Sequence, residues 1–211
     1  MAIDIYQFEQ IVSTKVTGRA LSAGYPDLLV HFLDAPARKD SDAVRAHHNN
    51  FKYPIAESVD VFREMGLELE VIDREKLQGC ERIFDLNNIL ALDEYDLVID
   101  PGTSEHCFNI PQALINLADA VKIGGFISQA LPMSMFNHGY WNVNPVALID
   151  FYELNGFEIL KFVIRHDEEI FSPKPEDRGR RMVSVPEDSV NLLLAKRLEK
   201  KLFRWPQQKL P

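Results

Sequence analysis

The sequence has few cysteines and no long hydrophobic run. Only Cys80 and Cys107 occur among 211 residues, without a CxxC or zinc-finger spacing, so neither a disulfide framework nor a structural zinc site is indicated. No apolar run approaches the roughly 20 residues that a membrane-spanning helix needs. The N-terminal segment lacks the basic and apolar regions of a signal peptide. We therefore expect a protein of the reducing cytoplasm that has no membrane partner.

Positive charge is also scarce. The chain carries 23 Lys and Arg against 32 Asp and Glu, a net charge of -9. An acidic chain repels nucleic-acid phosphates, so we expect no nucleic-acid partner, although Arg178, Arg180 and Arg181 form one local basic cluster. Hydrophobic residues make up 46% of the chain and charged residues 26%, which is ordinary for a globular protein.

Short hydrophobic segments alternate along the chain with helical patterns. The pattern predicts seven strands, at residues 20–24, 67–72, 81–84, 95–99, 126–131, 157–164 and 190–198, and helices at 55–65, 110–121 and from Asn144 onward. This alternation indicates one α/β domain over residues 1–211, with a mainly parallel seven-stranded sheet, helices on both faces and an antiparallel C-terminal strand. Residues 33–54 are polar and irregular, and we expect a lid or mobile insertion there.

Polar residues gather where the predicted strands end. Asp73 ends the second strand, Asp85 the third and Asp100 the fourth, and Glu105 and His106 follow shortly after. Open α/β sheets bind their ligands at this carboxyl edge. Each acid is also a common turn former, so a plain structural role is the alternative at every position.

The order of these motifs resembles class I S-adenosylmethionine-dependent methyltransferases from about residue 67 to 198. The third strand ends in "FDLNN". The stretch "YDLVIDPGTSEHCFNIPQALINLADAVKIGGFI" resembles the fourth strand, its following helix and the K-x-G-G turn into the fifth strand. "NHGYWNVNPVALIDFYELNGFEI" resembles the subgroup whose sixth helix follows an asparagine–histidine–glycine–aromatic loop. The glycine-rich turn usual after the first strand is reduced here to "SAGYPDLL".

The resemblance implies S-adenosylmethionine as the cofactor and assigns residues to it. Asp73 would hold the ribose hydroxyls, and Asp85 with the backbone of Leu86 would recognise the adenine. The full set of implied cofactor-binding residues is Gly24, Tyr25, Asp73, Asp85, Leu86, Asn87, Asp100 and Gly102. The single glycine of the first turn is the departure from the family pattern.

Two histidines are candidates for the base that takes a proton from the acceptor. His138 lies with Asn137 in a loop crowded with polar groups and aromatic rings, and His106 follows an acid. An imidazole with a near-neutral pKa suits this role. Alternatively, the loop folds back to fill a satellite core, and His106 only enters a helix capped by Asn109.

Three functions therefore remain open. The first is methyl transfer to a small-molecule acceptor, such as a sugar or glycan hydroxyl. The second is a methyltransferase-like binding or scaffold protein without turnover, with an oligomeric surface instead. The tail aromatics Phe203 and Trp205 dock either on the domain itself or on another subunit of a homo-oligomer. The third is a metal-dependent enzyme using His106, His138 and an acid. No spacing demands a metal, so none is predicted, and His47 and His48 are expected in a solvated loop.

Overall fold

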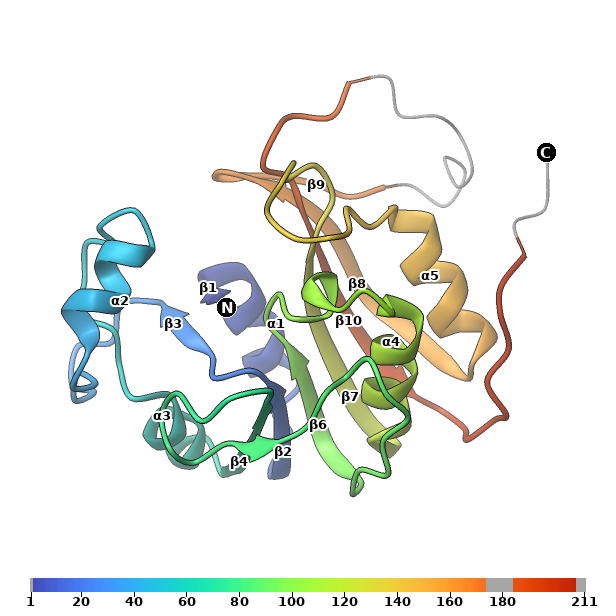
Figure 1. The fold of residues 1–211 in the computed structure, drawn as a ribbon, viewed down its shortest axis with the longest axis horizontal. Helices are drawn as coiled ribbons and strands as arrows, with labels where there is room; N and C mark the ends of the chain where they lie inside the picture. Colours follow the sequence, from blue (N-terminus) through green and yellow to red (C-terminus); the bar gives the residue numbers. More distant parts are fainter. Residues whose placement is uncertain (1, 174–183, 208–211) are drawn as a thin grey trace.

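The computed structural model describes residues 2–173 and 184–207, so Arg178, Arg180 and Arg181 lie outside the described part. Figure 1 shows the elements along the chain. The strands are β1 (Ala2–Asp4), β2 (Gly18–Ala23), β3 (Asp27–Leu29), β4 (Leu67–Asp73), β5 (Arg82–Ile83), β6 (Tyr95–Asp100), β7 (Val121–Pro132), β8 (Phe157–His166), β9 (Glu169–Phe171) and β10 (Val190–Arg197). The helices are α1 (Ile5–Ser13), α2 (Ser41–His47), α3 (Ser58–Glu64), the 3₁₀ turn η1 (Ser104–His106), α4 (Ile110–Asp119) and α5 (Pro145–Leu154).

The main sheet is mostly parallel, as predicted. Its order is β5-β4-β2-β6-β7-β10-β8-β9. The first five of these strands pair in parallel, and β10 runs antiparallel to both β7 and β8. The antiparallel C-terminal strand is therefore confirmed, between two other strands.

The predicted number of seven strands is wrong, because this sheet has eight. The additional strand is β9, which forms an antiparallel hairpin with the end of β8. With three residues it is too short to show the alternation that identifies a strand in sequence. A separate two-stranded parallel sheet joins β1 to β3.

Helices cover both faces of the sheet, as expected. On one face, Leu117 of α4 and Phe151 of α5 pack with Val98 and Ile127 in the larger hydrophobic cluster. On the other face, α1 and α3 pack with Leu97 and its neighbours in a second cluster. Val98 and Leu97 fall in different clusters because successive strand residues point to opposite faces.

Strand β7 begins earlier than its pattern predicts. Helix α4 ends at Asp119 and the strand starts at Val121, before the glycines that we read as a turn. A Cβ on Gly125 would lie 3.0–3.1 Å from three backbone carbonyl oxygens, those of Tyr95 and Asp96 in β6 and that of Lys122 in β7 itself. Glycine at this position allows the two strands to approach closely. The pairing with β6 shifts register between Val121 and Phe126, so the K-x-G-G segment forms an irregularity within β7.

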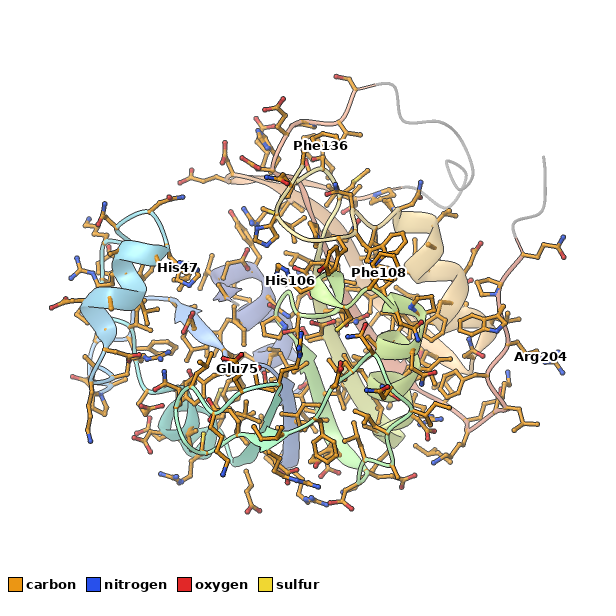
Figure 2. All side chains as sticks on the ribbon, viewed as in Figure 1. His47, Glu75, His106, Phe108, Phe136 and Arg204 are labelled. Carbon is orange, nitrogen blue, oxygen red and sulfur yellow. The ribbon has the colours of Figure 1, made fainter. Side chains whose placement is uncertain are left out.

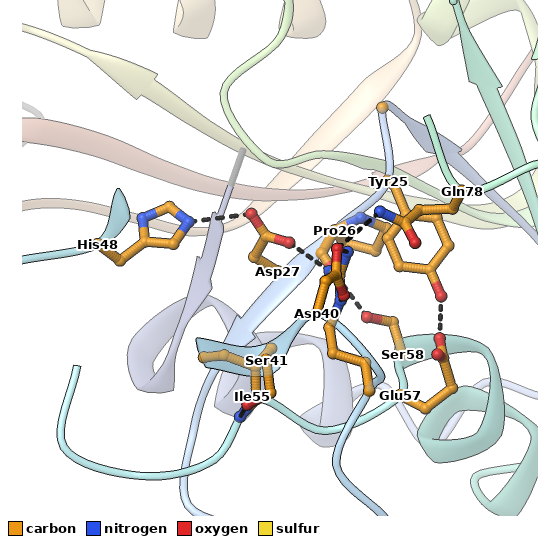
Figure 3. Close-up of polar contacts among 12 residues, drawn as sticks. Tyr25, Pro26, Asp27, Asp40, Ser41, His48, Ile55, Glu57, Ser58 and Gln78 are labelled. Carbon is orange, nitrogen blue, oxygen red and sulfur yellow. Dashed lines mark hydrogen bonds and ion pairs between the residues drawn. The ribbon is translucent and has the colours of Figure 1, made fainter. Parts of the chain in front are cut away.

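Residues 33–54 contain helix α2 and are fastened to β3 by ionic contacts (Figure 3). The buried guanidinium of Arg38 lies 2.5 Å from Asp27 Oδ1 and 2.6 Å from Asp40 Oδ1. Asp27 Oδ2 is 2.9 Å from Nε2 of His48, at the end of α2. The hydrogen bond from Arg38 holds the pKa of Asp40 below its usual value. This group, the Arg38 clasp, ties the segment to β3 of the small two-stranded sheet.

Candidate functional site

The sheet reverses its winding between β2 and β6. The chain passes from β2 outward to β4 and β5 and then returns to β6 on the other side of β2. Ligands of open α/β sheets bind outside the carboxyl ends of the strands at such a point. Here the two strand ends are joined directly, because the hydroxyl of Thr103 donates a 2.5 Å hydrogen bond to the carbonyl of Ala23. The candidate site surrounds this junction.

Asp100, at the end of β6, is fully buried. Its carboxylate accepts hydrogen bonds from the backbone N–H of Thr103 (2.8 Å), the Ser104 hydroxyl (2.5 Å) and the Gln129 amide (2.9 Å). Burial raises the pKa of Asp100, and these hydrogen bonds oppose that rise. In this structure the carboxylate therefore holds the turn into η1 against β7.

That turn seats Glu105 beneath the loop that follows β7. Gly102 adopts a φ of +90°, which favours glycine. The backbone N–H of Tyr140 donates to the carbonyl of Glu105 at 2.9 Å. A Cβ on Gly139 would lie 2.9 Å from Cγ of Glu105. Two glycines thus allow both segments to close around one acidic side chain.

Two histidines flank the Glu105 carboxylate. Its Oε1 atom lies 3.9 Å from Nε2 of His106 and 3.8 Å from Nε2 of His138. The imidazole rings are 5.2 Å apart between centroids. The glutamate side chain is 2% exposed, whereas the histidines are 46% and 51% exposed. The structure therefore brings the two predicted histidines together around a buried acid.

The surroundings of this group shift its acid–base properties. Burial, helped by the nearby Asp100 carboxylate, raises the pKa of Glu105 to about 8. Burial and the neighbouring His138 lower the pKa of His106. The Oε2 atom of Glu105 is buried without a hydrogen-bond partner among the described residues.

Aromatic side chains border the histidines. The Phe108 ring lies 5.7 Å from that of Tyr140 and 6.1 Å from that of Trp141, and Figure 2 shows Phe108 near His106 in the segment before α4. The Trp141 indole N–H donates to the carbonyls of Cys107 (3.1 Å) and Phe108 (3.2 Å). All three rings are exposed, so the expectation that this loop only fills a satellite core does not describe them.

Asn137 lies in the same loop, next to His138, and is exposed. Its φ of +64° places it in the left-handed region that asparagine tolerates better than most residues. The loop around it is held by a 2.8 Å hydrogen bond from the backbone N–H of Met135 to the side chain of Asn142. Asn137 therefore turns the chain immediately before His138.

The predicted cofactor acids lie at the end of β4 (Asp73) and just after β5 (Asp85), on the other side of β2 from β6. The Asp73 carboxylate accepts the backbone N–H of Arg74 at 2.6 Å. Asp85 accepts the backbone and side-chain amides of Asn87 at 3.0 and 2.8 Å, and these hydrogen bonds lower its pKa. Both acids thus accept hydrogen bonds within the turns that follow β4 and β5, at the carboxyl edge of the sheet.

Leu86 and Asn87 anchor the segment after β5. Leu86 is buried, and its carbonyl accepts the Asn116 side chain at 3.1 Å. The Asn87 side chain accepts the backbone N–H of Asn109 at 2.9 Å, and the Asn109 side chain donates to the carbonyl of Asn87 at 3.1 Å. Asn109 thus begins α4 as predicted, but its side chain makes no capping hydrogen bond and reaches the β5 segment instead.

The turn after β2 contains Gly24 and Tyr25. Gly24 has a φ of +81°, and its N–H donates to the carbonyl of Ile72 at 2.7 Å. The buried Tyr25 ring lies under the Arg38 guanidinium, 5.0 Å from its centroid, and its hydroxyl bonds to Glu57. Figure 3 shows this contact between the turn and α3's entry. The tyrosine side chain is thereby engaged by the Arg38 clasp and its neighbours.

Two parts of the site were not among the predicted site residues. The sequence pattern indicates Glu105 only as a neighbour of His106, although an acid directly beside a histidine at a strand end is the available signal. Phe108 carried no local signal, because its approach to Tyr140 and Trp141 depends on the folded loop. His47 lies away from this site at the end of α2 (Figure 2), and His48 is paired with Asp27. The expectation of a solvated loop for these two histidines is therefore wrong.

The similarity of this chain to known proteins lies in its fold. No protein-family model and no curated protein matches the sequence. The fold matches N-methyltransferase NodS from Bradyrhizobium japonicum in complex with S-adenosyl-L-homocysteine, at 11% identity over 92% of this chain and 85% of that one, with a TM-score of 0.53. It matches the 1,6-didemethyltoxoflavin-N1-methyltransferase of Burkholderia thailandensis at 10% identity over 92% and 76%, with a TM-score of 0.52.

A third match is TehB from Haemophilus influenzae, at 12% identity and a TM-score of 0.49; the chain spans 62% of its length. No helix in residues 2–173 or 184–207 has the length and apolar character needed to cross a membrane. The strand order and the two matches above a TM-score of 0.5 agree with the resemblance noted in the sequence. The chain has the fold of class I S-adenosylmethionine-dependent methyltransferases.

Proposed function

We propose that the protein transfers a methyl group from S-adenosylmethionine to a small-molecule acceptor. The observation that carries this proposal is the grouping of His106 and His138 around buried Glu105, beside exposed aromatic rings, at the carboxyl edge of the sheet. Support comes from the fold, since the matching NodS structure contains S-adenosyl-L-homocysteine, the product of the methyl donor. A site of this kind on this fold suits methyl transfer best.

The residues near the switch between β2 and β6 fit the cofactor. Asp73 ends β4 and Asp85 lies just after its paired strand β5, and carboxylates accept hydrogen bonds from ribose hydroxyls and an adenine amino group. Gly24 keeps the left-handed turn at the end of β2, so its backbone would lie beside the methionine part without a Cβ. Asp100 and Gly102 would shape the neighbouring turn, which follows β6.

When bound, the cofactor supplies an electrophilic methyl group on a sulfonium, which needs no acid in order to leave. The protein's own contribution is to position the acceptor and to remove its proton. We assign His138 as the base, with His106 as the alternative, because both imidazoles are half-exposed beside Glu105. Asn137 would direct a polar group of the acceptor toward these rings.

The acceptor is a small hydroxyl-bearing ring, and a sugar or glycan hydroxyl is our proposed class. Phe108, Tyr140 and Trp141 offer ring faces on which an apolar sugar face stacks. Asn137 and His138 offer hydrogen-bonding groups for its hydroxyls. We predict a cytoplasmic location because Cys80 and Cys107 are both free thiols. A homo-oligomeric state is also a prediction.

The test is thermal unfolding of the full-length protein with and without S-adenosylmethionine and S-adenosyl-L-homocysteine. A ligand at about 100 times its Kd adds roughly 2.7 kcal/mol of stability, which for a chain of this size raises the Tm by roughly 5–10 °C. A rise would be followed by a screen of sugar acceptors, with His138→Ala as the control that should lose transfer while still binding the cofactor. No rise with millimolar ligand would contradict the proposal.

One observation favours a second candidate function, a binding protein without turnover. Tyr25 and Pro26 occupy positions where the family usually has further glycines, and the tyrosine is fixed by Glu57. If the turn no longer admits the cofactor, the same unfolding experiment shows no shift. A shift without methyl transfer to any acceptor would favour a binding role that retains the cofactor.

A further inference from the structure

The carboxylate of Glu105 is unusual because it is buried beside two imidazoles without bonding to either. Distances of 3.8 and 3.9 Å from Oε1 to the two Nε2 atoms are too long for hydrogen bonds. Its second oxygen has no partner among residues 2–173 and 184–207. A buried carboxyl group in such surroundings either stays protonated or, when ionised, is stabilised by pairing with a cation. The geometry therefore leaves both carboxylate oxygens of Glu105 open to a further partner, with two imidazoles beside them.

The three side chains present donor atoms of the type that transition metals bind. One carboxylate oxygen and one nitrogen from each of His106 and His138 all lie within 4.8 Å of one another. A zinc ion with bonds of about 2.0–2.2 Å holds tetrahedral ligands about 3.4 Å apart. The two imidazoles are half-exposed, so small rotations of their side chains would close the remaining gap.

We propose that Glu105, His106 and His138 bind one divalent transition-metal ion, of which Zn²⁺ is the best-suited representative. Two imidazoles and one carboxylate are a ligand set of open zinc sites, which keep a fourth position for water or substrate. Imidazole nitrogens favour zinc over Mg²⁺ and Ca²⁺, which prefer oxygen ligands. The bound cation also offsets the electrostatic repulsion between Glu105 and the buried Asp100 carboxylate.

The fold positions these ligands more firmly than a chance surface cluster would be positioned. Adjacent residues seldom point to one place, but the tight 3₁₀ turn brings His106 back toward Glu105. The loop carrying His138 is fixed to the same turn by the Tyr140–Glu105 backbone hydrogen bond and by the close contact at Gly139. The three ligands thus come from two segments that are directly joined.

A metal here would change the role of the imidazoles. Their Nε2 atoms would be ligands and unable to accept a proton, while the open position would bind the acceptor's oxygen. The ion lowers the pKa of such an oxygen, and the proton leaves to solvent water. This consequence rests on the proposed function, whereas metal binding itself does not.

The experiment uses the full-length protein without an affinity tag, in a Cys80→Ser background that removes the exposed thiol. After dialysis against zinc buffered by a competing chelator, we expect one equivalent of zinc per chain and no displacement by millimolar Mg²⁺. His106→Ala and His138→Ala should each weaken the Zn²⁺ Kd by at least about 10-fold. His47→Ala and His166→Ala, which alter histidines elsewhere, should leave it unchanged.

Glu105→Gln should also weaken zinc binding, and circular dichroism with Tm measurements will show whether each variant folds. Because both histidines are half-exposed, their variants keep the test decisive even if the glutamate variant unfolds. No zinc retained by the parent protein, or equal retention by the site variants and the controls, would overturn the inference. Zinc retention without any Tm rise from the methyl donor would contradict the proposed function alone, and the reverse would contradict this inference alone.

Discussion

Oε1 of Glu105 and Nε2 of His138 lie 3.8 Å apart, although the whole of β7 separates these residues in the chain. The contact joins the turn after β6 to the loop after β7, at the edge where sheets of this type bind ligands. The glutamate is buried and the histidine is half-exposed, so one residue fixes the position and the other faces solvent. Any chemistry of the loop therefore depends on how it sits on this turn.

We predict that Gly139→Ala disturbs the packing of the loop after β7 on the turn after β6. Its backbone conformation is one that other residues adopt, but the added Cβ would lie 2.9 Å from Cγ of Glu105 and 3.0 Å from its carbonyl oxygen. The loop must shift, at a cost of about 1–3 kcal/mol, and should lose both methyl transfer and zinc retention. Urea unfolding measures the loss of stability, and assays of methyl transfer and of zinc retention measure the effect on the site.

The control for that variant is Gly79→Ala. A Cβ on Gly79 meets nothing within 4 Å, although its φ of +88° makes alanine strained. We expect a stability loss of about 1–2 kcal/mol from that strain and an unchanged site. Equal zinc retention by the Gly139 variant and the parent protein would show that the close contact is not required.

Two strand-end acids should respond differently to removal of their charge, Asp100 mainly in stability and Asp73 mainly in cofactor affinity. Asp100→Asn places an amide N–H₂ among the donors of Ser104 and Gln129 in a fully buried position, so we expect a loss of about 2–4 kcal/mol in the free energy of unfolding. Asp73→Asn, at a partly exposed strand end, should cost less than about 1 kcal/mol and lower the affinity for S-adenosyl-L-homocysteine by about 10-fold.

Urea unfolding separates the two stabilities, and calorimetric titration with S-adenosyl-L-homocysteine measures the affinity of the Asp73 variant. Undiminished binding by Asp73→Asn would remove this residue from the proposed cofactor site. A small stability loss for Asp100→Asn would show that its hydrogen bonds do not hold the turn.

The strand ends were visible in the sequence because each buried strand is an apolar run that stops at an acid or a glycine. Leu97, Val98 and Ile99 are fully buried and Asp100 follows them directly. A parallel sheet then brings such ends to one edge without further information. The positions of Asp73, Asp85 and Asp100 on that edge follow from this geometry.

Other features depend on tertiary contacts that no local pattern records. Helix α1 was not predicted because Gln7 and Gln10 lie on its buried face and interrupt the apolar periodicity; the Gln7 side chain bonds to the carbonyl of Asp100. Its available signal was Asp4, which accepts the backbone N–H of Gln7 as a cap. The approach of His138 to Glu105 likewise requires the folded loop.

The Arg38 clasp should make stability depend on pH in the acid range. Because the hydrogen bond from Arg38 lowers the pKa of Asp40 in the folded state, the folded protein favours the ionised carboxylate. That contribution is fully present above the unfolded pKa of about 3.9 and is lost as pH falls through the lower folded value. The stability difference between the parent protein and Asp40→Asn should therefore shrink below about pH 4.

Urea unfolding at several pH values measures this difference. Asp42→Asn is the matched control, because Asp42 lies in the same segment but its side chain is 98% exposed in its pair with Arg45. Its effect should be near zero throughout. A difference for Asp40→Asn that stays constant from neutral to acid pH would contradict the assigned ionic role.

The last prediction locates the metal through the two tryptophans. The Trp141 indole bonds to the carbonyl of Cys107, directly after His106, whereas Trp205 lies in the C-terminal tail and is exposed. Co²⁺ adopts zinc sites and quenches nearby fluorescence. We expect Co²⁺ to quench the single remaining tryptophan of Trp205→Phe strongly and that of Trp141→Phe weakly, with Zn²⁺ restoring the signal by competition. Equal quenching in both variants would place the ion elsewhere.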